Sequence, residues 1–207
     1  MSPSLSPLIH LIDDDAAVRD SLALLIGTVG LRVQQWGSPQ DFMAQFDRAG
    51  IGAIVLDVRM PGSSGLTVLD RLIAEGVDQP VIMLTGHGTV DMCRRAFKAG
   101  AAEFLEKPVD DQVLLDALQS AVQRHVGSRQ RNREDRDARE RYAQLSARER
   151  EVLGLIVAGL TNKEIGRALA VSPRTVETHR ANLFAKLDAE SLAQLIRRYA
   201  VLVENSA

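Results

Sequence analysis

Cysteine is almost absent from this chain of 207 residues, because Cys93 is the only one. A single cysteine excludes an intrachain disulfide, which fits a reducing compartment. Long apolar runs are absent as well, and no segment approaches the ~20 apolar residues that a helix needs to cross a bilayer. The N-terminal segment has no basic stretch and no apolar core, so it does not resemble a signal peptide. These absences predict a soluble cytoplasmic protein without membrane association.

Histidine is also scarce, and its few positions do not have the spacing of a metal site. The four histidines are His10, His87, His125 and His179. His179 falls in a predicted helix, where we expect a partly buried and hydrogen-bonded side chain rather than a metal ligand. Cys93 also falls in a predicted helix and is expected to be a small packed side chain rather than a nucleophile.

The net charge of −2 conceals an uneven distribution along the chain. Residues 1–126 carry 10 basic and 16 acidic side chains, whereas residues 127–207 carry 15 basic and 11 acidic ones. This asymmetry indicates different partners for the two halves, with nucleic acid a candidate for the basic half. The excess is small, however, and a mildly basic solvated helical surface would show it too.

Short apolar segments alternate with helical patterns up to residue 126. The predicted strands are Leu8–Ile12, Leu31–Trp36, Ala53–Leu56, Val81–Leu84 and Glu103–Leu105. The predicted helices are Ala16–Val29, Pro39–Asp47, Thr67–Glu75, Val90–Ala99 and Asp110–His125. Such regular alternation predicts an α/β domain, with a parallel sheet covered by helices on both faces.

Several of these strands end on residues that carry chemistry. Asp13 and Asp14 end the first strand, Asp57 ends the third, and Lys107 follows the last. Because ligand sites in open α/β sheets lie at the carboxyl ends of the strands, we expect these side chains to meet. Carboxylates at this spacing repel one another unless a hard cation such as Mg²⁺ is bound, and an ammonium nearby suits a phosphoryl group. Thr85, at the end of the fourth strand, adds a hydroxyl donor.

Each of these features alone has an ordinary explanation. A run of aspartates is usually a solvated turn or a helix cap, and Asp15 is expected to cap the first helix. A Lys-Pro pair is usually a loop entry, and a Thr-Gly pair is usually a turn. The set favours function because every member falls at a strand end in the required order.

The C-terminal part of the sequence is helical throughout. Two capping boxes, Ser146 with Glu149 and Thr161 with Glu164, open two helices, and Ser172 and Ser191 cap two more. Four short helices joined by tight turns predict a bundle of the helix-turn-helix kind. Residues 127–143 separate this bundle from the first domain and have little apolar character. We favour a partly helical linker there, although the pattern also allows a flexible tether.

The first domain resembles the receiver domain of bacterial two-component response regulators. The matching motifs are Asp13-Asp14, Asp57 followed by Met60-Pro61-Gly62, Thr85-Gly86, Gly100 to Leu105, and Lys107-Pro108. The resemblance implies a flavodoxin-like (βα)5 fold in which Asp57 accepts a phosphoryl group from a phosphohistidine on a sensor histidine kinase. It also implies a cis Lys107–Pro108 bond. An aromatic residue often follows this proline in the family, whereas this chain has Val109. The difference affects only what the resemblance implies about the packing of the fifth helix.

The same resemblance implies roles for the residues around Asp57. The Mg²⁺ ligands would be Asp13, Asp14, Asp57 and the backbone carbonyl of Arg59. Thr85 and Lys107 would bind the phosphoryl oxygens. Phe104 occupies the aromatic switch position, buried or exposed according to the state of Thr85.

The C-terminal domain resembles the LuxR-type, four-helix DNA-binding domain of the same regulators. The matching segments are Leu145 to Leu153, Gly159 to Ile165 and Val171 to His179, and the whole chain is most similar to the FixJ-like subgroup. Three apolar residues of the third helix, Val176, Leu183 and Leu187, are expected to face the core. Outward residues of a recognition helix enter the major groove, and basic residues nearby bind phosphates. The candidate DNA contacts are Lys163, Arg174, Thr175, Glu177, Thr178, Arg180, Ala181 and Lys186.

These observations predict a phosphorylation-dependent transcriptional regulator rather than an enzyme. The predicted domains are a receiver over residues 1–126, a charged linker over residues 127–143 and a DNA-binding domain over residues 144–207. Phosphorylation of Asp57 is expected to favour a homodimer that binds double-stranded promoter DNA. The predicted partners are a cognate sensor histidine kinase, the DNA and RNA polymerase.

Three alternatives use some of the same residues. An aspartyl-phosphate hydrolase of the dehalogenase type normally needs an acid two residues after its nucleophile, where this chain has Arg59. A ligand-sensing regulator with the same output domain would not need the acidic residues at the strand ends. A receiver that no longer uses phosphate would be free to lose Thr85 and Lys107, which are both present.

Overall fold

The computed structural model describes residues 7–204, and it divides into two compact units at the bond between Arg129 and Gln130. Residues 1–6, where the sequence shows no signal-peptide features, lie outside the described part. Among residues 7–204, no helix combines the length and the apolar character that a membrane crossing requires.

The first unit is built on a five-stranded parallel sheet with the order β2-β1-β3-β6-β7. Its strands are β1 (Leu8–Ile12), β2 (Arg32–Trp36), β3 (Gly52–Asp57), β6 (Val81–Thr85) and β7 (Glu103–Glu106). Its helices are α1 (Ala16–Gly27), α2 (Pro39–Gln45), α3 (Gly65–Ala74), α4 (Val90–Lys98) and the first part of α5 (Asp111–Ala143). The predicted flavodoxin-like fold is therefore confirmed.

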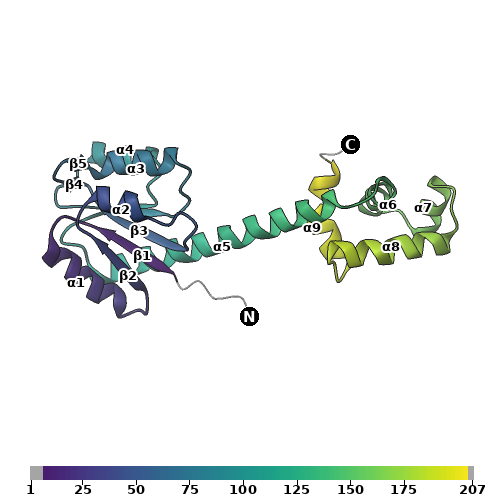
Figure 1. The fold of residues 1–207 in the computed structure, drawn as a ribbon, viewed down its shortest axis with the longest axis horizontal. Helices are drawn as coiled ribbons and strands as arrows, with labels where there is room; N and C mark the ends of the chain where they lie inside the picture. The colour runs from purple at the N-terminus through teal and green to yellow at the C-terminus, as the bar shows by residue number, and fades with distance from the viewer. Residues whose placement is uncertain (1–6, 205–207) are drawn as a thin grey trace. The chain divides into compact units, whose positions relative to one another are not determined.

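Two apolar layers hold helices against the two faces of the sheet. Ile54 and Leu56 of β3 pack with α2, α3 and α4, whereas Ala53 and Val55 pack with α1 and α5. Figure 1 shows this division, with α2, α3 and α4 on one side of the sheet and α1 on the other. Because successive side chains of a strand point to opposite faces, a central strand between two helical layers must be apolar throughout.

The strand order brings the predicted site together. The chain reverses direction across the sheet at β1, so the carboxyl ends of β1 and β3 are neighbours and form the switch point where ligands bind. β7 lies two strands away from β3, with β6 between them. A long side chain is therefore needed to reach from the end of β7 to the end of β3, and Lys107 supplies it.

A short hairpin after β3 was missed in the sequence. β4 (Arg59–Met60) pairs antiparallel with β5 (Ser63–Ser64) around Pro61-Gly62. Gly62 has φ 77°, which the third position of a Pro-Gly turn requires. Gly65 follows the hairpin, and its N–H donates to the carbonyl of Val58 at 2.9 Å.

Helix α5 is longer than predicted, since it runs from Asp111 to Ala143 and includes all of the predicted linker residues. Its charged central part contains side-chain pairs at helical spacing, such as Gln130 with Glu134 at 2.7 Å. Its last turns contribute Ala138 to the core of the second unit. Of the two conformations that the sequence allowed for this segment, the structure has the helical one.

The second unit is a helical bundle. Its helices are α6 (Ala147–Val157), α7 (Asn162–Ala168), α8 (Pro173–Leu187) and α9 (Leu192–Glu204), together with the end of α5. Both predicted capping boxes are present, and Ser172 and Ser191 accept backbone hydrogen bonds as predicted. Val176, Leu183 and Leu187 are completely buried, which confirms the predicted inner face of α8.

Candidate functional site

Three of the predicted site residues meet at the carboxyl edge of the sheet. The Lys107 ammonium donates to Asp13 Oδ2 at 2.5 Å and to Asp57 Oδ1 at 2.7 Å. Asp13 and Asp57 are 2% and 5% exposed, so both carboxylates are held inside the protein by one cation. The peptide bond between Lys107 and Pro108 is cis, as the resemblance implied.

Burial and charge act in opposite directions on these groups. Burial raises the pKa of Asp57, and Lys107 offsets only part of that rise. Burial lowers the pKa of Lys107, but its hydrogen bonds and charge contacts with Asp13 and Asp57 raise it above the ordinary value overall. Lys107 is therefore a fixed cation beside an aspartate that is more basic than one at the surface.

The second carboxylate oxygen of Asp57 is oriented by the loop that follows β3. The backbone N–H of Arg59 donates to Asp57 Oδ2 at 2.6 Å. That loop is itself held by Gly65, because a Cβ there would lie 2.1 Å from the carbonyl oxygen of Asp57. Only glycine allows α3 to begin so close to the end of β3.

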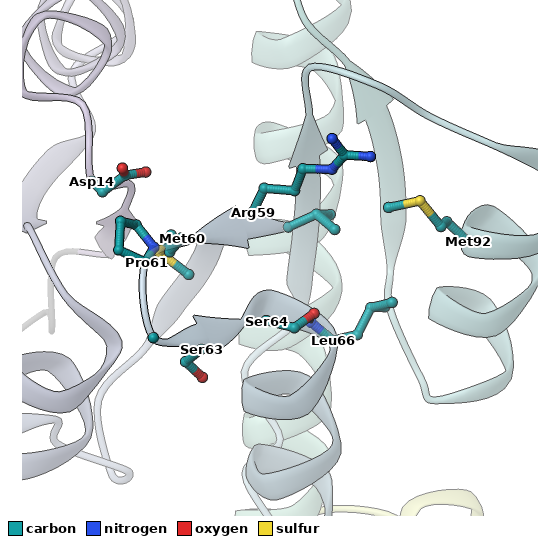
Figure 2. Close-up of a pocket in the computed structure, with 10 residues that line it drawn as sticks. Asp14, Arg59, Met60, Pro61, Ser63, Ser64, Leu66 and Met92 are labelled. Carbon is teal, nitrogen blue, oxygen red and sulfur yellow. The ribbon is translucent and has the colours of Figure 1, made fainter.

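Asp14 has a different environment from Asp13. It is exposed, and it lines an open pocket of about 750 Å³ together with residues of the β4–β5 hairpin and α4. Figure 2 shows Asp14 beside Met60 and Pro61 on one side of this pocket and Met92 of α4 on the other. Its carboxylate is thus accessible from solvent next to the buried pair.

The acidic residues fit a hard cation in part. Among residues 7–204, no three acidic, histidine or cysteine side chains lie close enough together to hold a metal ion. Asp13 and Asp57 do converge, because each accepts a hydrogen bond from the same ammonium. Two carboxylates and several waters are the usual environment of Mg²⁺ in proteins, so this donor set suits it. Receiver domains, which the first unit resembles in sequence, in general bind Mg²⁺ at an acidic site of this kind.

The predicted switch residues lie on β6 and β7, beside the same edge. Thr85 is fully buried, and its hydroxyl accepts from the N–H of His87 at 3.3 Å, whereas its carbonyl accepts from the N–H of Lys107 at 2.7 Å. Phe104 is half-buried against the core on the α3 and α4 side. The N–H of Gly88 donates to Glu106 at 3.0 Å. Glu106, whose contact no sequence motif indicated, thus links the loop after β6 to β7.

The candidate DNA contacts lie on α7 and α8 of the second unit. All except Arg180 are exposed, and Arg180 is half-buried. The Lys186 ammonium lies 2.6 Å from Glu149 Oε1, so this candidate is already paired with α6. Lys186, beside Glu149, lowers the pKa of that carboxyl to about 2, and hydrogen bonds from Ser146 add to the effect.

The turn between α7 and α8 is tightly packed. A Cβ on Gly166 would lie 2.8 Å from the carbonyl oxygen of Val171, so glycine permits the close approach of the turn. Ala170, in the turn, has φ 53° in the left-handed region. His179 is half-buried on α8, which confirms the partial burial that was predicted for it.

Known proteins match both units of the chain. Residues 9–119 match the family described as response regulator receiver domain, and residues 143–199 match the family described as bacterial regulatory proteins, luxR family. The transcriptional regulatory protein FixJ of Azorhizobium caulinodans is 46% identical over 189 residues, which cover 91% of this chain and 90% of that protein.

Two solved structures extend over nearly the whole chain. The response regulator StyR is 35% identical, with a TM-score of 0.81, and the match covers 98% of this chain and 100% of that one. Full-length FixJ from B. japonicum is 38% identical, with a TM-score of 0.60, and the match covers 99% and 100%.

Proposed function

This chain belongs to the two-component response regulators that join a receiver domain to a LuxR-type DNA-binding domain, and we propose that phosphorylation of Asp57 controls its binding to promoter DNA. It is a transcriptional regulator rather than an enzyme, as the sequence predicted. The match of residues 9–119 to the receiver family supports this proposal over that of a ligand-sensing regulator. The proposed domains keep the predicted boundaries, residues 1–126, 127–143 and 144–207.

One observation carries the proposal for Asp57: its carboxylate is buried, converges with Asp13 and is bound by Lys107. An Asp57 oxygen attacks the phosphorus of a phosphohistidine on the kinase. The other ring nitrogen of the phosphohistidine carries a proton, so when the bond between phosphorus and the imidazole nitrogen breaks, the bonding pair returns to that nitrogen and a neutral imidazole leaves. Lys107 then binds an oxygen of the new phosphoryl group, while the Arg59 N–H holds the other carboxylate oxygen.

Asp13, Asp14 and Asp57 are the proposed Mg²⁺ ligands, with the carbonyl of Arg59 as a further one. When bound, the cation neutralises charge on the carboxylates and on the phosphoryl oxygens. The carboxylate of Asp14 lies on the solvent side, so its side chain must turn toward the buried pair to take part.

The acyl phosphate carries roughly −1.5 to −2 charge, a figure extended from hydroxyl phosphates, where the ionised Asp57 carboxylate carries −1. The Thr85 hydroxyl turns from His87 toward the phosphoryl group, and Phe104 fills the space that Thr85 leaves. The surface near α4 and β7 then favours a homodimer, which brings two α8 helices to adjacent half-sites of the DNA.

The DNA-binding residues are proposed from their exposure on α7 and α8. Outward residues of α8 contact base edges, and the basic residues at helix starts contact phosphates. Lys186 must break its ion pair with Glu149 to reach a phosphate, so we expect it to contribute less to DNA binding than the other candidates. Contact with RNA polymerase and a cytoplasmic location complete the proposal.

Labelling of Asp57 is the direct test. Incubation with a small phosphodonor and Mg²⁺ is expected to label the protein, and Asp57→Ala and Asp57→Asn are expected to abolish the label. Full labelling of Asp57→Ala would remove the proposal. Sedimentation and binding to promoter DNA, with and without beryllofluoride, test the later steps. Beryllofluoride is expected to increase both the fraction of dimer and the affinity for the DNA.

A further inference from the structure

We propose that Arg19 is a positioning residue for the acidic loop, because it fixes the peptide that joins Asp13 to Asp14 and thereby sets the affinity of the site for a divalent cation. The inference rests on the proposed function, since it concerns the same site. Arg19 lies in the first turns of α1 and was not among the predicted site residues.

The guanidinium of Arg19 is directed at the backbone of the acidic loop. Its Nη1 donates to the carbonyl oxygen of Asp13 at 2.6 Å, a short charge-assisted hydrogen bond. The side chain is half-buried, and its guanidinium lies beside Gly37, where a Cβ would be 3.7 Å away. Among residues 7–204, Arg19 makes no ion pair within 4.0 Å with a carboxylate. Its guanidinium therefore interacts with the Asp13 carbonyl without competition from a carboxylate.

Other contacts hold Asp13 from different directions. Its N–H donates to the carbonyl of Trp36 at 3.2 Å, and its Oδ1 accepts from the N–H of Asp15 at 3.0 Å. Its Oδ2 accepts from Lys107. The bond from Arg19 is the contact that acts on the peptide between Asp13 and Asp14.

The orientation of that peptide plane sets the direction in which the Asp14 side chain leaves the backbone. In a planar trans peptide, the carbonyl of Asp13 and the N–H of Asp14 point in opposite directions. When Arg19 holds the carbonyl toward α1, the N–H of Asp14 is turned away from α1. Without Arg19 the plane can rotate, and the two acidic side chains lose their common orientation toward a cation.

Charge and position predict opposite effects of removing Arg19. A positive charge near a cation site repels the cation, so through-space charge alone makes binding tighter when Arg19 is neutralised. Loss of positioning makes binding weaker instead. The sign of the change in affinity therefore separates the two.

The experiment counts free Mn²⁺ by its electron paramagnetic resonance signal in the presence of the full-length protein, with Mn²⁺ as the probe for an oxygen-ligand site. Arg19→Met is expected to bind roughly tenfold more weakly than the original chain, as is typical when a residue that orients a metal ligand is lost. Arg19→Lys, which keeps one donor and the charge, is expected to recover part of the affinity.

One control tests where the ion binds, and a second tests the effect of removing a positive charge elsewhere in the receiver unit. Asp13→Asn is expected to lose the binding, which assigns the counted ion to this edge of the sheet. Arg32→Met removes an exposed cation at the opposite end of the strands and is expected to leave the affinity unchanged. Urea unfolding followed by the fluorescence of Trp36, the only tryptophan, reports the stability of the receiver unit in each variant.

Each result decides the inference. Unchanged or tighter Mn²⁺ binding by Arg19→Met overturns it, whether or not the stability falls. If Arg19→Met does not fold, equal affinity of Arg19→Lys and the original chain would overturn it, because a lysine cannot reproduce the guanidinium geometry. Failure of the original chain to bind Mn²⁺ would instead overturn the proposed cation site, and the inference with it.

Discussion

An alanine at position 65 would place its Cβ 2.1 Å from the carbonyl oxygen of Asp57 and 3.0 Å from Val58 Cα. Both atoms belong to the backbone, so no side chain can rotate to make room. Normal carbon–oxygen contact requires a displacement of more than about 1 Å, and overpacking of this kind costs typically 1–3 kcal/mol. We expect Gly65→Ala to lower the free energy of unfolding of the receiver unit by about 3 kcal/mol, the upper end of this range.

The displacement also moves the end of β3, which carries Asp57, the proposed phosphoacceptor. Gly65→Ala is therefore expected to slow labelling of Asp57 even in protein that remains folded. Urea unfolding followed by Trp36 fluorescence measures the first effect, since this tryptophan lies in β2 of the receiver unit. Labelling by a small phosphodonor measures the second.

A matched glycine provides the control of opposite sign. Gly27 is the last residue of α1, and a Cβ there would have nothing within 4 Å. Gly27→Ala should therefore be neutral or should stabilise the protein by up to about 1 kcal/mol, through helix propensity. A loss of less than about 1 kcal/mol for Gly65→Ala would refute the reasoning from the close approach.

Two further predictions concern His10 and the turn between α7 and α8. Burial lowers the pKa of His10 to about 4, with the charge of Asp47 opposing the shift, while the unfolded value is 6.5. The folded state thus favours neutral His10, so its contribution is complete above pH 6.5 and falls as the pH decreases toward 4, by about 2–3 kcal/mol. Urea unfolding from pH 7 to 4 should show this loss, and His10→Phe should reduce it; an equal loss in His10→Phe would assign it to other groups. Ala170→Gly should stabilise the second unit by about 0.5–1 kcal/mol in calorimetry, because glycine adopts φ 53° without strain; a lower melting temperature would contradict this.

Much of the candidate site could be predicted from local sequence. Asp13, Asp14 and Asp57 follow apolar runs, and in a βα alternation such runs become parallel strands whose carboxyl ends share one edge. The helix starts were equally local, since Ser146 and Thr161 each bond a backbone N–H three residues on. These signals need no knowledge of distant contacts.

Other features depend on residues far apart in the chain. Asp13 and Lys107 are separated by 94 positions in the sequence, and although the strand ends predict that they share one edge, only the strand order with β7 next to β6 brings the Lys107 ammonium to 2.5 Å from Asp13 Oδ2. The sequence predicted that Lys186 is available to bind a DNA phosphate. In the structure α6 packs on α8, and Lys186 forms an ion pair with Glu149. Arg19 resembled any polar helix residue.

The hairpin after β3 and the length of α5 lie between these cases. Met60-Pro61-Gly62 contains a clear turn signal, but strands of two residues are too short to show alternation. The charged residues of α5 are compatible with either a helix or a tether, because a segment without large apolar side chains gains little from packing.

Apolar periodicity, capping residues and strand-end aspartates were sufficient to predict the five strands of the parallel sheet, most of the helices and the candidate phosphoacceptor position, because each signal is encoded within a few neighbouring residues. Tertiary structure alone decided which oxygen Lys107 binds, that Asp14 faces solvent while Asp13 is buried, and that Arg19 holds the peptide between them. Those outcomes depend on strand order and on helix packing, which join residues that no local pattern connects.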